Sequence, residues 1–370
     1  MKHENSSIFR VEDMGIKELL YLMIERDASD LHLKVGRPPG LRIHGELTPL
    51  EDIPPLTPED VERFIDEVIT EEQKAVFAAE KELDLAYTVP GLSRFRVNLF
   101  KQRNQMGMVL RAIPIKIKTI KELGLPPVVA ELAAKPRGLV LVVGPTGSGK
   151  STTLAAMIDH INTTQRKHIV TIEDPIEFWH EDKMSYVDQR QVGQDTNSFH
   201  VALKYALRQD PDVIMVGEMR DLDTITAAIT AAETGHLVLG TLHTTSAAQT
   251  IDRIIDVYPP GQQQQVRMQL SLTIQGVISQ TLLRRRDGKG RVCAMEIMVA
   301  NSAIRSLIRE GKTHQIPSVI QTGVQEGMQT LNQALRTLYQ KGLITREAAL
   351  EVSNNPDELI RMLGGGTIKR

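Results

Sequence analysis

Cysteine is nearly absent from this chain of 370 residues, in which Cys293 is the only one. A single thiol excludes an internal disulfide and a cysteine-rich zinc site, as is typical of a protein from a reducing compartment. The sequence also lacks an uninterrupted apolar run near the roughly 18 residues of a membrane span, and residues 1–10 lack the apolar core of a secretory signal. We therefore expect a cytoplasmic protein without direct membrane insertion, which reaches a membrane only through a partner.

A strong charge of either sign is missing as well. The formal net charge is −2 and the isoelectric point is about 6.6. Because nucleic-acid-binding domains are normally basic, we expect no nucleic-acid partner. Hydrophobic residues make up 41% of the chain and charged residues 24%. This composition can fill ordinary globular cores, and the length predicts two or three domains.

What the chain does contain is a glycine-rich loop between two patterned segments. The apolar run 139–143 predicts a buried strand, and apolar residues recur at helical spacing over 154–161. Strand, glycine-rich loop and helix in this order are the context of a phosphate-binding loop, whose backbone N–H groups and helix N-terminus attract phosphate. The residues expected to bind nucleotide are Gly144, Pro145, Thr146, Gly147, Ser148, Gly149, Lys150, Ser151 and Thr152.

Two side chains at the end of this loop have a predicted chemical role. Lys150 can reach the β- and γ-phosphates of ATP, and the Ser151 hydroxyl can hold Mg²⁺. The alternative is an ordinary glycine turn, which the full spacing and the Lys-Ser end disfavour. We therefore expect ATP and Mg²⁺ as cofactors.

Carboxylates follow two further predicted strands. Glu173 and Glu177 come after the apolar segment 168–172, at a strand end where we expect metal and water chemistry, and Glu218 comes after the segment 213–216. Residue 217 is a glycine at the place where ATPases usually have a metal-side aspartate, so Glu218 is the expected group that orients the attacking water. The alternatives are a polar loop for the first pair and a helix-dipole partner for Glu218.

Histidines flank a third predicted strand. His236 precedes the apolar segment and His243 follows it, with threonines beside His243. This pattern is typical of a γ-phosphate sensor that couples hydrolysis to motion, and a purely structural role for the two rings is the alternative.

The region before the glycine-rich loop has a different pattern. Residues 1–115 predict a small α+β domain with an antiparallel sheet, and residues 116–130 predict a linker that acts as a hinge. Arg96 and Arg111 lie on two strands of that domain, either as solvated residues or as groups that reach the γ-phosphate when the domains close. After the α/β core at 131–300, we expect a helical segment at 301–370 with a flexible tail.

In order along the chain, these motifs resemble the secretion ATPases of type II secretion and type IV pili. Residues 171–177, 216–221 and 235–246 look like that family's Asp box, Walker B motif and His box. Residues 303–310 match a helix of the pilus-retraction branch except at Ser306. That branch lacks the four-cysteine zinc insertion of the assembly and secretion ATPases, as this chain does.

The resemblance implies a PAS-like first domain, a RecA-like second domain and a homohexameric ring. It also implies a peripheral place at the inner membrane through a pilus platform protein, with a paralogous accessory ATPase as a further partner. ATP hydrolysis would close and open the two domains and power pilus retraction and twitching motility. By the same resemblance, Glu177, Glu218, His236 and His243 belong to the active site, and arginines of the first domain contact nucleotide. The alternative functions are a RecA-like nucleic-acid translocase and an accessory or regulatory paralogue of the pilus motor.

Overall fold

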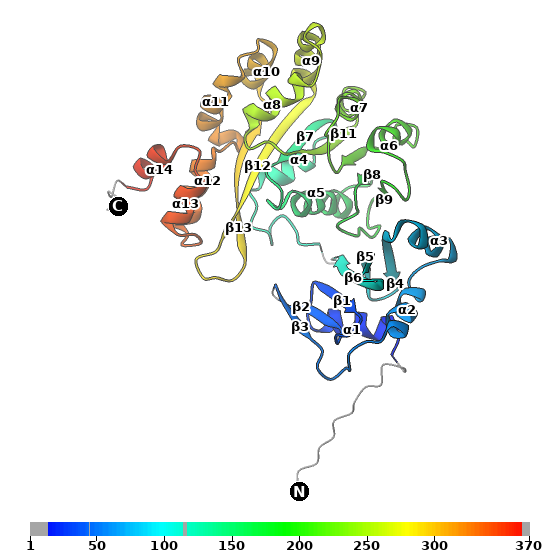
Figure 1. Ribbon diagram of the computed structural model, residues 1–370. Coiled ribbons are helices and arrows are strands. Elements are labelled where there is room, and N and C mark those ends of the chain that lie inside the picture. Colours follow the sequence, from blue (N-terminus) through cyan, green and yellow to red (C-terminus); the bar gives the residue numbers. More distant parts are fainter. Residues whose placement is uncertain (1–13, 44, 114–116, 365–370) are drawn as a thin grey trace. The chain divides into compact units, whose positions relative to one another are not determined.

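The computed structural model describes residues 14–43, 45–113 and 117–364 (Figure 1). They belong to two compact units, Met1–Lys116 and Ile117–Arg370, and each unit is described by itself. Residue 116, the first of the expected linker, and residues 365–370 of the expected tail lie outside the described ranges. Among the described residues, no helix combines the length and the apolar character needed to cross a bilayer.

The first unit is built on a six-stranded antiparallel sheet in the order β3-β2-β1-β6-β5-β4. Its elements are α1 (Ile16–Glu25), β1 (Asp30–Lys34), β2 (Gly40–Ile43), β3 (Glu46–Pro49), α2 (Pro58–Asp66), α3 (Glu71–Glu80), β4 (Glu82–Val89), β5 (Ser93–Gln102) and β6 (Gln105–Ile113). Because side chains alternate along a strand, Phe95, Val97 and Leu99 of β5 enter the core while Arg96 stays exposed. The predicted α+β fold with an antiparallel sheet is confirmed.

The second unit contains a seven-stranded sheet in the order β13-β12-β7-β11-β10-β8-β9. The strands are β7 (Gly138–Val143), β8 (His168–Glu173), β9 (Tyr186–Gln191), β10 (Val213–Val216), β11 (Leu237–Leu242), β12 (Ile274–Arg284) and β13 (Arg291–Val299). All neighbours pair in parallel except β12 and β13, which form an antiparallel ribbon. The predicted α/β class is therefore confirmed, with a mixed and mostly parallel sheet.

Helices cover both faces of this second sheet (Figure 1). On one face, Leu139 and Leu141 of β7 join a core with α6 (Phe199–Ala206), α7 (Leu222–Glu233), α8 (Ala247–Asp256), α9 (Pro260–Thr273), α10 (Ser302–Arg309) and α11 (Ile316–Thr322). On the other face, Val140 and Val142 join a core with α4 (Val128–Ala133) and α5 (Lys150–Thr164). Strands buried on both faces explain why the central segments of the sequence are continuous apolar runs.

The chain ends in helices that pack on the β12–β13 ribbon. These are α12 (Leu331–Gln340), α13 (Arg346–Val352) and α14 (Pro356–Met362). Leu335 and Leu359 belong to one buried cluster with Leu283 of β12 and Ala294 of β13. The predicted C-terminal helices are present, and they share one compact unit with the parallel sheet.

Candidate functional site

The glycine-rich loop, residues 144–149, joins β7 to α5. Gly144 has a φ of 147° and Gly149, which caps α5, has a φ of 88°, and both values favour glycine. A Cβ on Gly144 would also lie 2.4 Å from the backbone oxygen of Gln280. The loop therefore depends on glycine for its conformation and for a close approach to β12, and it ends at the N-terminus of a long helix that favours anions.

Lys150 bends back over this loop. Its Nζ donates hydrogen bonds to the carbonyl oxygens of Gly144 at 2.9 Å and Pro145 at 3.1 Å. Burial lowers the pKa of Lys150, while the nearby Glu218 and Glu177 act in the opposite direction. The ammonium group is thus held over the loop, where phosphate oxygens would be a stronger pair of acceptors.

Glu173 ends β8 in an almost closed environment. Its side chain accepts hydrogen bonds from the Thr171 hydroxyl at 2.6 Å, the Gln189 amide at 3.1 Å and the backbone N–H of Glu177 at 3.4 Å. Burial raises the pKa of Glu173 and outweighs these hydrogen bonds, which lower it. Glu177 itself is exposed.

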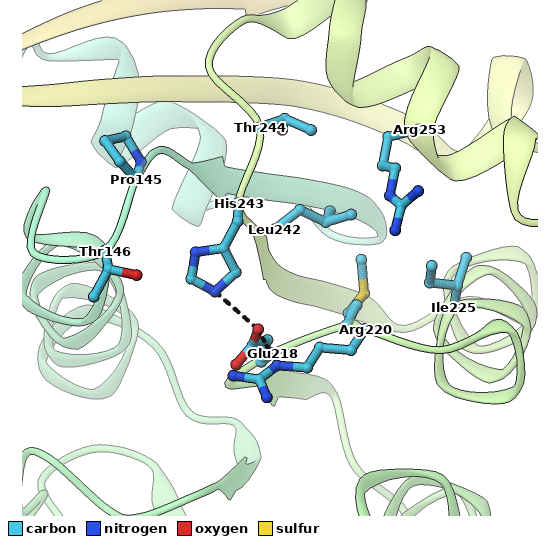
Figure 2. Close-up of a pocket in the computed structure, with 10 residues that line it drawn as sticks. Pro145, Thr146, Glu218, Arg220, Ile225, Leu242, His243, Thr244 and Arg253 are labelled. Atoms are coloured by element: carbon cyan, nitrogen blue, oxygen red, sulfur yellow. Dashed lines mark hydrogen bonds and ion pairs between the residues drawn. The ribbon is translucent and has the colours of Figure 1, made fainter.

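Glu218 follows β10 and meets His243, which follows the neighbouring strand β11 (Figure 2). The Nε2 atom of His243 lies 2.8 Å from Oε1 of Glu218, and Arg220 forms an ion pair with the same oxygen. Burial alone would raise the pKa of Glu218, but Arg220 and His243 together lower it below the ordinary value. Glu218 is therefore held as an anion at the edge of the sheet.

These parts come together at the carboxyl edge of the parallel sheet. A cavity of about 450 Å³, the loop cavity, is lined by the glycine-rich loop, Ser151, Glu173, Glu177, Glu218 and His243. A second hollow of about 720 Å³ shares Thr146, Glu218, Arg220 and His243 with it. Carboxyl edges of this kind are where open α/β sheets bind ligands. The structure thus collects the predicted loop, all three predicted carboxylates and one of the two predicted histidines.

His236 lies elsewhere. It precedes β11, whereas His243 follows it, so a strand of roughly 20 Å lies between the two residues. The Nδ1 atom of His236 lies 2.9 Å from the carbonyl oxygen of Ala231, and the residue lines neither of the two hollows described above. The expectation that both histidines flank one sensor therefore needs correction within a single chain, because the two ends of a strand face opposite edges of a sheet.

Arg96 and Arg111 belong to the first unit, where they are cross-strand neighbours on β5 and β6. The Nε atom of Arg111 donates to Oδ1 of Asp30 at 2.7 Å, and Nε of Arg96 lies 3.9 Å from Oδ1 of Asp84. Both arginine side chains remain largely exposed, at 67% for Arg111 and 48% for Arg96. They form a basic pair on the open face of that sheet, and their contact with nucleotide stays a prediction.

Three residues around the loop cavity were not anticipated from the sequence. Arg220 pairs with Glu218, Gln189 of β9 supports Glu173, and Gln280 of β12 donates to the loop carbonyl of Ser148. Arg220 could have been found from its place two residues after Glu218. The two glutamines come from strands far along the chain, and no local pattern in the sequence marks them.

Known proteins are similar to this chain over most of its length. The family described as type II/IV secretion system protein matches residues 91–351. The type IV pilus retraction ATPase PilT of Pseudomonas aeruginosa is 53% identical over 344 residues, which cover 93% of this chain and 99% of that protein. A twitching motility protein of Neisseria gonorrhoeae is 50% identical over 321 residues, covering 87% of this chain and 86% of that protein.

A solved structure of similar fold supports the same relationship. The crystal structure of the pilus retraction motor PilT with bound ADP has a TM-score of 0.88 to this chain and is 51% identical in sequence. The superposition covers 94% of this chain and 100% of the other. The similarity therefore extends over both compact units, beyond the loop cavity itself.

Proposed function

The chain belongs to the type II/IV secretion system protein family, and we propose that it is the ATP-hydrolysing motor that retracts type IV pili and so drives twitching motility. The observation that carries this proposal is the near full-length similarity to a pilus retraction ATPase, at 53% identity over 93% of this chain. The loop cavity supports it, because the phosphate loop, Glu218 and His243 line one cavity.

In this proposal ATP lies on the glycine-rich loop. The loop N–H groups and the α5 N-terminus receive the phosphates, and Lys150 exchanges its bonds to the Gly144 and Pro145 carbonyls for bonds to the β- and γ-phosphates. Glu218, kept ionised by Arg220 and His243, accepts a hydrogen bond from the attacking water and aligns it with the γ-phosphorus. A carboxylate with a lowered pKa is a weak base. We therefore propose that the main role of Glu218 is to orient the water rather than to abstract its proton.

A magnesium ion fits the oxygen groups of the loop cavity. Among the described residues, no group of three or more histidine, cysteine, aspartate or glutamate side chains could hold a metal ion. Ser151, at the start of α5, lines the cavity together with Glu173 and Glu177. Oxygen ligands, phosphate and water are what Mg²⁺ prefers. The ion would neutralise charge on the phosphates, with Ser151 as its protein ligand.

Force production needs motion between the two compact units. We propose residues 1–115 and 131–300 as the moving domains, with 116–130, which runs into α4 at Val128, as hinge. Arg96 and Arg111 are the groups that approach the nucleotide when the domains close. Six such chains would form a ring in the cytoplasm at the inner membrane and act on a pilus platform protein, alone or with a paralogous ATPase. His236 takes no step in its own chain's cavity.

Complementation of a bacterial strain that lacks its retraction motor tests the proposal. The wild-type chain should restore pilus retraction, and Lys150→Ala should abolish both retraction and ATP turnover. Lys204→Ala, an exposed lysine on α6, is the matched control and should behave as wild type. An expressed chain that hydrolyses ATP yet restores no retraction would overturn the proposal. Strong stimulation of turnover by DNA would indicate a nucleic-acid translocase instead.

A further inference from the structure

Strand β12 runs directly beside the strand that leads into the glycine-rich loop. It pairs in parallel with β7, with Ser279 opposite Val143. The next residue, Gln280, therefore lies beside Gly144, where the loop begins, and its backbone oxygen occupies the space that a Cβ on Gly144 would need. The side chain of Gln280 is almost fully enclosed, at 1% exposure. One wall of the loop is thus made by a residue far away in sequence.

The side chain of Gln280 makes a single directed contact with the loop. Its Nε2 atom donates a hydrogen bond to the carbonyl oxygen of Ser148 at 2.7 Å. Because that partner is a carbonyl, only the NH₂ end of the amide can make this bond. In a trans peptide the C=O and N–H groups point in opposite directions. A Ser148 carbonyl held toward β12 therefore turns the N–H of Gly149 toward the open side of the loop.

The other end of the same amide argues against a role in packing alone. Oε1 of Gln280 is buried and has no hydrogen-bond partner among the described residues. A buried polar atom without a partner costs about 1–3 kcal/mol, which an apolar residue of similar volume would not incur. Packing alone would therefore favour an apolar residue here, and among the described residues the contact that a glutamine adds is its bond to Ser148.

We propose that Gln280 is a positioning residue for phosphate binding, which aims the N–H of Gly149 at the β-phosphate of the nucleotide. The inference rests on the proposed ATPase function of the same site. Strand β12 would then contribute to the affinity for the phosphate groups of the nucleotide as well as to the sheet. Because the contact acts on one peptide group of the loop, its loss should affect nucleotides that place a β-phosphate there and spare those that do not.

Two substitutions separate this role from a structural one. Gln280→Met keeps the length of the side chain and removes the donor, so the peptide of Ser148 and Gly149 is free to turn. We expect ADP to bind about five- to tenfold more weakly, the size of one lost hydrogen bond, while AMP affinity stays near wild type and the melting temperature does not fall. Gln280→Glu replaces the donor with an acceptor that faces the Ser148 carbonyl, and it should weaken ADP binding further.

Binding of fluorescent ADP and AMP analogues to the full-length chain, together with melting curves, measures these effects. The control is Gln275→Met on the same strand, whose side chain accepts from Arg305 and lies away from the loop; ADP affinity should not change. Wild-type ADP affinity in Gln280→Met, or an equal loss for AMP and ADP, would overturn the inference and leave the ATPase proposal intact. A wild-type chain that binds no ADP would overturn both.

Discussion

Glu173 ends strand β8 and Glu218 follows the adjacent strand β10. The electrostatic surroundings of these two carboxylates are opposite. Glu173 at the end of β8 is 8% exposed and accepts from a hydroxyl, an amide and a backbone N–H, all neutral donors. Glu218 after β10 has a more open side chain and two basic neighbours, Arg220 and His243. Burial raises the pKa of Glu173, whereas the basic groups outweigh burial and lower that of Glu218.

This difference shows that a place at the carboxyl edge does not by itself give a carboxylate its role. A charged group is stabilised by nearby opposite charge and destabilised by the loss of water. Glu218 therefore remains an anion that can align water, while Glu173 resists ionisation and works as a hydrogen-bond acceptor that fixes the turn after β8. The comparison predicts unequal responses to the same isosteric substitution.

The largest effect is expected on turnover. Glu218→Gln removes the anion that orients water, so kcat should fall by about 100-fold or more while ATP still binds. Glu173→Gln keeps an oxygen that can accept from Thr171 and Gln189, so kcat should fall by less than about tenfold on the same scale. Steady-state ATPase assays and a separate ATP-binding measurement test both.

An exposed carboxylate on α13 provides the matched control for these variants. Glu351→Gln lies outside both hollows at the carboxyl edge and should leave turnover unchanged. Equal losses in Glu173→Gln and Glu218→Gln would break the comparison, because they would show that both groups act as anions during hydrolysis.

A smaller effect is expected on stability as a function of pH. Since the folded pKa of Glu173 is raised, the folded state holds its proton more tightly than the unfolded chain. The contribution of Glu173 to the stability of the wild type therefore falls as pH rises above the ordinary value of 4.5. Glu218 has a lowered folded pKa, so it contributes stability above 4.5 that is lost as pH falls through the folded value.

The two Gln variants should consequently diverge. Between about pH 4 and pH 7, the melting temperature of Glu173→Gln should rise relative to wild type, and that of Glu218→Gln should fall relative to wild type, each by on the order of 2 °C. Melting curves in buffers of constant ionic strength measure this. Parallel curves for the two variants would mean that the two sites do not differ in the way described.

Where a short local pattern carries the chemistry, the residues that the sequence singles out line one cavity of the structure. The loop from Gly144 to Ser151 and the acids after two apolar strands need only the order of elements to be placed. Parallel strands end at one edge, and there the structure brings Glu218 and His243 to within 2.8 Å of each other. His236 lies at the other edge of the sheet, because two residues that flank a strand in sequence lie at its opposite ends.

The strands and site residues that the sequence could not predict are those in which polar and apolar residues are mixed. β4, β9 and the length of β12 carry charged or polar residues among apolar ones, so periodicity alone does not reveal them. Gln189 and Gln280, on two of these strands, hydrogen-bond to Glu173 and to the Ser148 carbonyl. Their roles depend on sheet order, which puts β9 beside β8 and β12 beside β7. No spacing along the chain encodes that order.

The smallest expected effect concerns Arg220. Its side chain is 77% exposed, and its guanidinium lowers the pKa of Glu218. An exposed ion pair contributes at most about 1 kcal/mol, so Arg220→Gln should reduce kcat by less than about fivefold near neutral pH. Without the guanidinium the pKa of Glu218 rises, and the acidic limb of the pH–rate profile should move upward by less than about one unit. Arg208→Gln, an exposed arginine beyond α6, should leave the profile unchanged. An acidic limb that does not move in Arg220→Gln would assign the ionisation of Glu218 to His243 alone, and the contrast with Glu173 would then rest on a single neighbour.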